Sequence, residues 1–427
     1  MWYKLKSGFK DTENRVLLSN FFSLSVLQVA SHLFPLITFP YLVRVLGVEL
    51  FGVLAVATAV IAYFQILTDY GFDLSATKEV SIYRDDSVKI VEIFSSIMII
   101  KSMLVVLSLI ILTVLVFSIE RFSQNWEVYY FTFGVVIGQV LFPIWFFQGM
   151  EKMKYITMLT ITSKFIFTLS IFIFVQEQND FIWVPLLNAT GAITAGLISL
   201  YIIKKDFKVK FVWQSASTIK HYFQGGWDIF VQRFYVNLYG STSVIILGLL
   251  TNNMVVGYYA IAEKIVGIFS EFFSVVSTVY YPYFAKKFVA NPKKSLTNLK
   301  KVSLVMLGLS ITATILLLFL DDFVVKMVSG EQYNERITQT LEILTYGIIL
   351  FPFFSLYTTV LVAIDQARAL NIVARDSALL SLILAPILII LFQEKGLAYL
   401  MVLLWFIIIF RYVKVILHVN RSLVQSN

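Results

Sequence analysis

The sequence predicts an all-α polytopic membrane protein that crosses the bilayer about twelve times, and three observations support this fold class. Hydrophobic residues make up 59% of the 427 residues and charged residues only 14%, whereas soluble proteins carry about 25% charged residues. The mean hydropathy is +0.82. Apolar runs of about 20 residues, enough for a helix to cross about 30 Å of hydrocarbon, recur along the whole chain. Strands of a membrane barrel would instead be shorter and alternate in polarity.

Twelve apolar runs are long enough to be transmembrane helices, six in each half of the chain. In order, they cover about residues 17–43, 51–72, 93–117, 128–148, 155–175, 181–203, 225–250, 255–284, 302–320, 338–363, 373–392 and 396–418. The loops expected on the outer side are all short, and the longest covers about residues 321–337. Neither side therefore has room for a separate catalytic domain.

The distribution of basic residues predicts the orientation of these helices. Of the 34 lysines and arginines, 25 lie in loops or in adjoining helix ends on the side of the N-terminus, and five lie in the opposite loops. Basic loops stay in the cytoplasm, so we expect both termini there. This asymmetry also explains the pI of about 9.3 without a nucleic-acid partner. The first apolar run is too long for a removable signal peptide and eleven more follow it.

The composition excludes several kinds of chemistry. The chain has no cysteine, so it has no disulfide, no thiolate nucleophile and no iron–sulfur ligand. Its three histidines, His32, His221 and His418, lie on well-separated segments, which argues against a histidine metal site. No glycine-rich loop ends in Gly-Lys-Ser/Thr, so ATP hydrolysis has no support. We expect no cofactor, no metal and no enzymatic activity.

An internal repeat at an offset of 205 residues divides the chain into two halves. The matching pairs are Gly52/Gly257, Ala55/Ala260, Ala57/Ala262 and Phe64/Phe269. The two copies lie in the second and eighth predicted helices, an offset of six helices, so both copies cross the membrane in the same direction. Parallel repeats of this kind are common in secondary transporters. We predict an N-terminal six-helix lobe (residues 1–210) and a C-terminal one (211–427), related by a pseudo-twofold axis along the membrane normal, with a lysine-rich connector at about 204–224 and substrate in a cleft between the lobes.

Charged side chains inside the predicted helices are candidate functional residues, because burying one in hydrocarbon costs about 2.5–3.5 kcal/mol or more. The cations are Lys101, Lys164, Arg233 and Lys264, and the acids are Asp69, Asp228, Glu263 and Glu271. Cations would bind a phosphate or pyrophosphate, and carboxylates would bind the protons or sodium ions that drive transport. The alternative is that these charges pair across helices and only stabilise the bundle. Asp69 and Asp73 lie near the predicted membrane surface, where solvation would also account for them.

Four segments of the chain form recognisable motifs. Residues 39–47 read FPYLVRVLG and residues 69–81 read DYGFDLSATKEVS. Residues 143–151 read PIWFFQGME and residues 257–265 read GYYAIAEKI. These motifs resemble the signatures of Wzx-type polysaccharide flippases, which belong to the same superfamily as multidrug antiporters. The resemblance extends over about residues 15–415.

The resemblance implies a MATE-like fold of twelve helices, similar to multidrug antiporters and the lipid II flippase. It implies translocation of an undecaprenyl-pyrophosphate-linked O-antigen oligosaccharide to the outer leaflet of the bacterial inner membrane, by alternating access coupled to an ion gradient. Arg44, Glu263 and Lys264 fall within its motifs; we add Arg44 to the substrate-binding candidates Lys101, Lys164, Arg233 and Lys264. The expected partners are this lipid-linked oligosaccharide, the bilayer, a polysaccharide polymerase and a chain-length regulator, and the expected state is a monomer.

Three other functions remain as alternatives. A MATE-like drug or metabolite antiporter would favour acidic groups for cationic substrates, whereas four intramembrane cations favour an anionic ligand here. A membrane-embedded polysaccharide polymerase or ligase would need a sizeable outer loop, which the chain lacks. A scaffold without transport activity would have all of its intramembrane charges paired.

Overall fold

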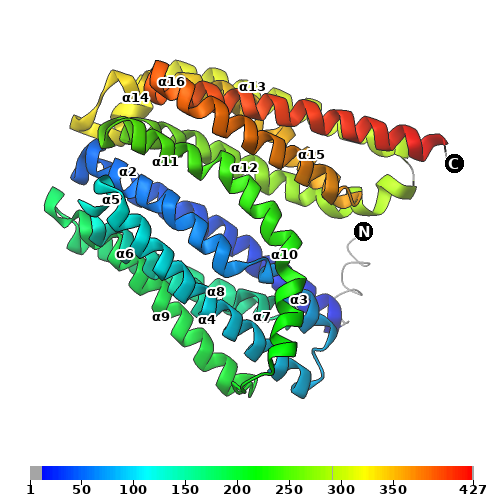
Figure 1. The fold of residues 1–427 in the computed structure, drawn as a ribbon. Helices are drawn as coiled ribbons and strands as arrows, with labels where there is room; N and C mark the ends of the chain where they lie inside the picture. Colours follow the sequence, from blue (N-terminus) through cyan, green and yellow to red (C-terminus); the bar gives the residue numbers. More distant parts are fainter. Residues whose placement is uncertain (1–11, 291, 426–427) are drawn as a thin grey trace. The chain divides into compact units, whose positions relative to one another are not determined.

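The computed structural model describes residues 12–290 and 292–425, and within them the secondary structure is entirely helical (Figure 1). The helices group into two compact units. The first unit comprises Met1–Phe39 and Val60–Phe234, and the second comprises Pro40–Ala59 and Tyr235–Asn427. The division of the chain into lobes at residues 210 and 211 stays a prediction.

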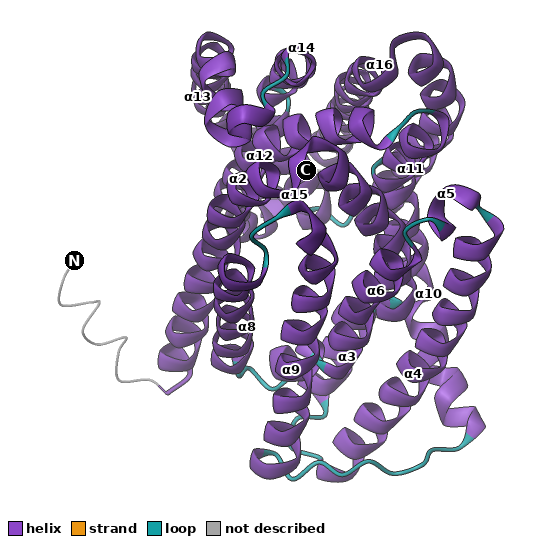
Figure 2. Cartoon of the chain, turned by 90° about the vertical axis from the view of Figure 1, so that its left-hand side faces the viewer, coloured by secondary structure: helices purple, strands orange, loops and turns teal. Residues whose placement is uncertain are grey.

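Short loops join the helices (teal in Figure 2). The helices up to the end of α10 are α2 (Thr12–Asp69), α3 (Phe72–Ile82), α4 (Ser87–Ser118), α5 (Glu120–Ser123), α6 (Trp126–Leu141), α7 (Ile144–Gly149), α8 (Met153–Phe174), η1 (Gln178–Ile182), α9 (Trp183–Asp206) and α10 (Ala216–Tyr239). The remaining helices are α11 (Ser241–Leu250), α12 (Asn253–Ala290), α13 (Pro292–Ser329), η2 (Gly330–Gln332), α14 (Glu335–Thr345), η3 (Tyr346–Ile349), α15 (Phe351–Ala363) and α16 (Ala367–Gln425).

Eight helical segments of the described residues are long and apolar enough to cross a membrane, or nine if the bent pair Glu335–Ile349 and Phe351–Ala363 forms one span. The twelve predicted runs are helical over most of their length, although breaks at residues 70–71, 142–143, 240 and 350 divide four of them. Two long helices each contain two runs. Gly47 (φ 79°) interrupts α2 between the first two runs, and Gln393 (φ 53°) interrupts α16 between the last two. The eighth run, in α12, is not among these eight segments of the described residues.

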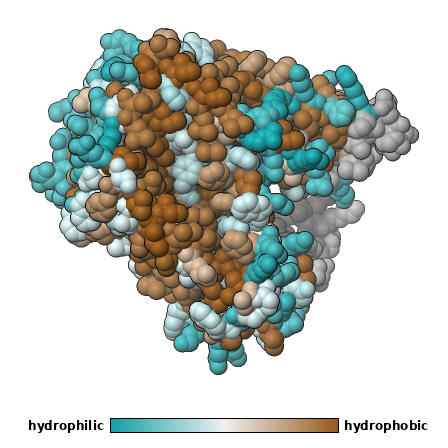
Figure 3. Space-filling model, in the orientation of Figure 1, coloured by the Kyte–Doolittle hydropathy of each residue, from teal (hydrophilic) through white to brown (hydrophobic). Residues whose placement is uncertain are grey.

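The predicted membrane-facing surface is visible in the exposure of large apolar side chains. Phe319 is 86% exposed, and Leu304 and Ile390 are each 70% exposed. Figure 3 shows hydrophobic residues over much of the face in view, with hydrophilic residues gathered toward its edges. A water-soluble monomer rarely exposes such large apolar patches. The predicted all-α, multi-pass membrane fold is thus confirmed.

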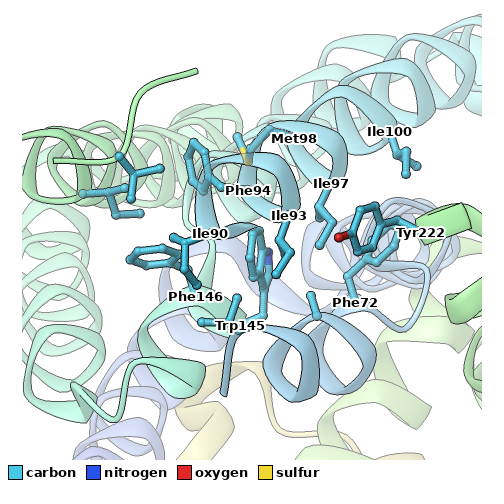
Figure 4. Close-up of a cluster of buried hydrophobic side chains, with 14 of the residues drawn as sticks. Phe72, Ile90, Ile93, Phe94, Ile97, Met98, Ile100, Trp145, Phe146 and Tyr222 are labelled. Carbon is cyan, nitrogen blue, oxygen red and sulfur yellow. The ribbon is translucent and has the colours of Figure 1, made fainter. Parts of the chain in front are cut away.

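The core of the first unit fixes the helices that carry the candidate site. Phe72 of α3, Ile93 of α4, Trp145 and Phe146 of α7 and Tyr222 of α10 are all buried in one cluster (Figure 4). These five side chains come from four helices, α3, α4, α7 and α10. Burying an aromatic side chain stabilises such a contact by about 1.5–3 kcal/mol, so the cluster holds α3, α4 and α10 together.

In the second unit, the 20-residue segment 40–59 of α2 packs against α12 through two glycines. A Cβ atom on Gly52 would lie 1.9 Å from the carbonyl oxygen of Asn253, and one on Gly257 would lie 2.1 Å from the carbonyl oxygen of Val48. The 205-residue offset relates Gly52 to Gly257 and Val48 to Asn253. The contact is therefore reciprocal: each repeat presents its glycine to the same backbone position of the other. Small residues allow membrane helices to approach this closely.

Candidate functional site

A sharp turn between α2 and α3 positions two carboxylates of the first unit. Asp69 is the last residue of α2, and Asp73 lies in the first turn of α3. Between them, Tyr70 (φ 51°) and Gly71 (φ 80°) both have left-handed backbone conformations. A Cβ atom on Gly71 would lie 2.6 Å from Cβ of Ile229, so both conformation and space favour glycine at this position.

Helix α10 packs directly on this turn. The ring of Tyr70 is 2% exposed and stacks on Phe223 and Phe230, with centroid distances of 4.4 and 5.1 Å. Gly226 lies against the backbone of Tyr70, because a Cβ atom there would be 2.3 Å from the Tyr70 carbonyl oxygen. Arg233 lies seven residues after Gly226, on the same face of α10. The packing of the turn therefore directs Arg233 toward the two carboxylates.

Asp69, Asp73, Lys101 and Arg233 form one ion-pair cluster, which we call the four-charge cluster. The guanidinium of Arg233 donates from Nη1 to Oδ2 of Asp69 at 2.7 Å and from Nη2 to Oδ2 of Asp73. Nζ of Lys101, on α4, donates to Oδ1 of Asp69 at 3.4 Å. With all four groups ionised, the charges of the cluster sum to zero.

The cluster has a buried end and an accessible end. Lys101 is 2% exposed and Asp69 is 8% exposed, whereas the side chain of Arg233 is 36% exposed. Oδ1 of Asp73 is buried and has no hydrogen-bond partner among the described residues. One end thus holds an ion pair in a low-dielectric environment, where breaking the pair strongly destabilises the fold. The other end carries a cation that solvent or a ligand can reach.

The ion pairs of the four-charge cluster can be replaced in two ways, by an anion on Arg233 or by a cation on the carboxylates. An anion that binds Arg233 competes with two carboxylates for one guanidinium, whose fork suits a phosphate as well as a carboxylate. A proton or a metal cation that binds Asp69 or Asp73 removes the negative charge that holds Arg233. Either event would alter the charge balance of the other groups, because all four belong to one network.

The structure brings three of the nine predicted site residues, Asp69, Lys101 and Arg233, into the four-charge cluster. Lys164, on α8, instead donates from Nζ to the carbonyl oxygen of Ser31 at 3.3 Å. In the second unit, Arg44 donates to the carbonyl oxygen of Met327 near the end of α13. The remaining predicted residues are exposed, one on α10 and three on α12: Asp228, Glu263, Lys264 and Glu271.

Sequence reasoning missed the role of Asp73, which it attributed to solvation at the membrane surface. The available signal was its position four residues after Asp69, across a Tyr-Gly turn.

It also missed a second charged contact, in the second unit. Nε of Arg336 donates to Oε1 of Glu394 at 2.8 Å, and Glu394 is 1% exposed. The Arg336 guanidinium also lies 5.1 Å from the ring centre of Tyr258. Arg336 and Glu394 lie in predicted loops, and Tyr258 lies in one of the four motifs. Because the three residues are far apart in sequence, no local pattern indicated the contact.

Comparisons with known proteins agree with this architecture. A family model described as "Polysaccharide biosynthesis protein" matches residues 17–288. A protein of Escherichia coli (strain K12) named "Putative O-antigen transporter" is 29% identical over 390 residues, covering 91% of this chain and 94% of the relative. A protein of Shigella dysenteriae with the same name is 27% identical over 248 residues, covering 58% of this chain and 62% of the relative.

Solved structures of membrane transporters share the fold. An inward-facing multidrug resistance MATE family transporter of the MOP superfamily matches with a TM-score of 0.69 at 11% identity, over 93% of this chain and 99% of that one. A lipid II flippase in an inward closed conformation matches with a TM-score of 0.54 at 15% identity, over 96% and 90% of the two chains. The predicted MATE-like fold and the resemblance to polysaccharide flippases are both confirmed.

Proposed function

Because this chain belongs to the polysaccharide biosynthesis protein family, we propose that it is a flippase for lipid-linked oligosaccharides. Its substrate is an undecaprenyl-pyrophosphate-linked O-antigen unit, which it moves from the inner to the outer leaflet of the bacterial inner membrane. The names of its relatives and the transporter fold support this assignment over an enzyme. The asymmetry of basic residues supports a cytoplasmic location for both termini.

The proposed mechanism rests on one observation: two carboxylates share one accessible guanidinium. Arg233 is held by Asp69 and Asp73, while Lys101 stays with Asp69 at the buried end. In our proposal, the pyrophosphate of the substrate recruits Arg233, and a proton or sodium ion takes its place on the carboxylates. Cation binding and substrate binding then favour each other, so the two events are thermodynamically coupled through one guanidinium. Release of the substrate restores the ion pairs.

The other candidate residues take supporting roles in this proposal. Arg44, Lys164 and Lys264 provide further cations for the pyrophosphate and glycan. Asp228, Glu263 and Glu271 are additional candidates for ion coupling or gating. The flippase acts as a monomer, alongside a polysaccharide polymerase and a chain-length regulator.

Export of the lipid-linked oligosaccharide tests the proposal in cells that lack this gene. Restoring the wild-type gene should return surface polysaccharide, and cells without it should accumulate the lipid-linked unit on the inner leaflet. The Arg233→Ala variant should lose export at normal membrane levels of the protein. Arg375→Ala is a matched control, because Arg375 forms an exposed pair with its neighbour Asp376; this variant should export normally.

Two results would contradict the proposal at different levels. Normal export by Arg233→Ala would remove the four-charge cluster from the mechanism while leaving the flippase assignment intact. Normal polysaccharide in the deletion strain, together with altered sensitivity to small molecules, would instead favour the antiporter. The acidic residues would then be the first to test.

A further inference from the structure

The connector between α9 and α10 combines lysines with exposed aromatic side chains. We define it as residues 204–213, which begin in the last turn of α9 and end before α10 starts at Ala216 (Figure 1). Residues 207–215 lie outside both adjacent candidate spans, Gln178–Asp206 and Ala216–Leu250. The connector therefore lies where two membrane helices leave the hydrocarbon region.

Two inward contacts fix the path of the connector on the first unit. Val209 is 6% exposed and its N–H donates to the carbonyl oxygen of Ile203 at 3.4 Å. The N–H of Val212 donates to Oγ of Ser95 at 3.0 Å, and Ser95 is fully buried on α4. The segment is thus held against α4 and α9, although residues 207–213 have no regular secondary structure.

Asp206 accepts a hydrogen bond from the Tyr155 hydroxyl at 3.0 Å. The other side chains of the connector that face away from these inward contacts are basic or apolar. Phe211 is 54% exposed and Trp213 is 77% exposed, and their rings meet edge to face at 6.1 Å. Four exposed lysines accompany this ring pair: Lys204, Lys205, Lys208 and Lys210. Nζ of Lys205 lies 5.6 Å from the ring centre of Tyr201, itself 61% exposed.

We propose that the connector binds anionic phospholipid headgroups and seats Phe211 and Trp213 in the interfacial layer of the membrane. Tryptophan favours the headgroup level, where its ring is partly desolvated and its N–H stays hydrated. Lysines near an anionic surface attract it electrostatically, and their alkyl stems can lie along apolar surface. An acidic protein partner would satisfy the lysines but would not explain why the ring pair lies beside them at the membrane boundary. This binding is independent of the transported substrate.

Quenching of Trp213 fluorescence by brominated lipids tests this site in the full-length protein. The protein is reconstituted in phosphatidylcholine nanodiscs containing a small fraction of acyl-brominated phosphatidylglycerol or, separately, the same fraction of brominated phosphatidylcholine. Subtracting the signal of the Trp213→Phe variant isolates this tryptophan from the other six. We expect stronger quenching by the anionic lipid, because the lysines enrich it locally.

The lysine variants decide whether the connector causes this enrichment. Each lysine near an anionic surface contributes a factor of roughly five in affinity, so Lys208→Gln/Lys210→Gln should weaken the preference about 25-fold. The matched control, Lys300→Gln/Lys301→Gln, removes the same charge from exposed positions in the second unit and should keep the preference. High salt should also weaken the preference in the wild type, because it screens exposed charges.

Three results would overturn the inference. The first is equal quenching by the two brominated lipids in the wild type. The second is an unchanged preference in the connector variant. The third is the absence of lipid quenching at Trp213, which would place the ring pair away from the membrane and indicate a protein partner instead. None of these results depends on export, so they leave the proposed flippase function unaffected.

Discussion

Replacing Gly52 with alanine should destabilise the folded protein by about 1–3 kcal/mol, the usual cost of inserting a methyl group into close-packed structure. The new Cβ atom would lie 1.9 Å from the carbonyl oxygen of Asn253 and 2.9 Å from the backbone nitrogen of Gly257. Ordinary contacts start at 3.4 Å, so the two helices must separate by about 1.5 Å, given that rigid backbone atoms cannot rotate away.

A matched substitution on α12, the helix that contacts Gly52, should raise the free energy of unfolding instead of lowering it. Gly267 lies ten residues after Gly257 on α12, and a Cβ atom there would meet no heavy atom of the described residues within 4 Å. Alanine is favoured over glycine in a helix by up to about 1 kcal/mol, so Gly267→Ala should stabilise slightly. The measurement is the free energy of unfolding by sodium dodecyl sulfate in mixed micelles, for both variants and the wild type.

The double variant Gly52→Ala/Gly257→Ala adds a test of the reciprocal contact. Once one substitution has separated the helices, the second meets less resistance, so the combined cost should be smaller than the sum by about 0.5–3 kcal/mol. A Gly52→Ala variant as stable as Gly267→Ala would refute the close approach. Strict additivity would show that the two glycines do not share one interface.

The remaining predictions concern the charged contacts and use the same unfolding measurement. Lys101→Ala should lower the free energy of unfolding by at most about 3 kcal/mol, because Asp69 keeps its bond to Arg233. Removing one partner of a buried pair usually costs about 3–5 kcal/mol. A loss above about 3 kcal/mol would mean that Arg233 does not neutralise Asp69. Arg336→Ala should cost about 3–5 kcal/mol, because it leaves the carboxylate of Glu394 buried without its cation. A loss below about 1 kcal/mol, the range of exposed pairs, would contradict that burial.

Hydropathy predicted the helices of this fold well, because the bilayer imposes a length and an apolar composition on each span. It could not predict how helices join. Gly47 breaks α2 without ending it, and Gln393 does the same in α16, so residues that sequence reasoning assigned to loops continue the helices. At about 321–337 the expected loop is also largely helical, because α13 extends to Ser329.

The candidate site was only partly predictable, because charge in a membrane helix is visible in the sequence but its partner is not. The cost of burying Asp69, Lys101 and Arg233 identified them as candidates, yet their meeting depends on the left-handed turn at Gly71 and on the packing of α10. Asp73 joins them only because of that turn. Such contacts between residues 160 or more positions apart leave no periodic signal in a single sequence.

The grouping of residues 40–59 with the second unit limits how chimeras of this family can be built. A hybrid that joins the first half of one relative to the second half of another at the connector would place a foreign 40–59 segment against α12. The glycine contact would then be assembled from two parents whose backbones never evolved together. Grafting the 40–59 segment along with the second half would keep that contact native, so exchanges of substrate specificity between relatives should use three crossover points rather than one.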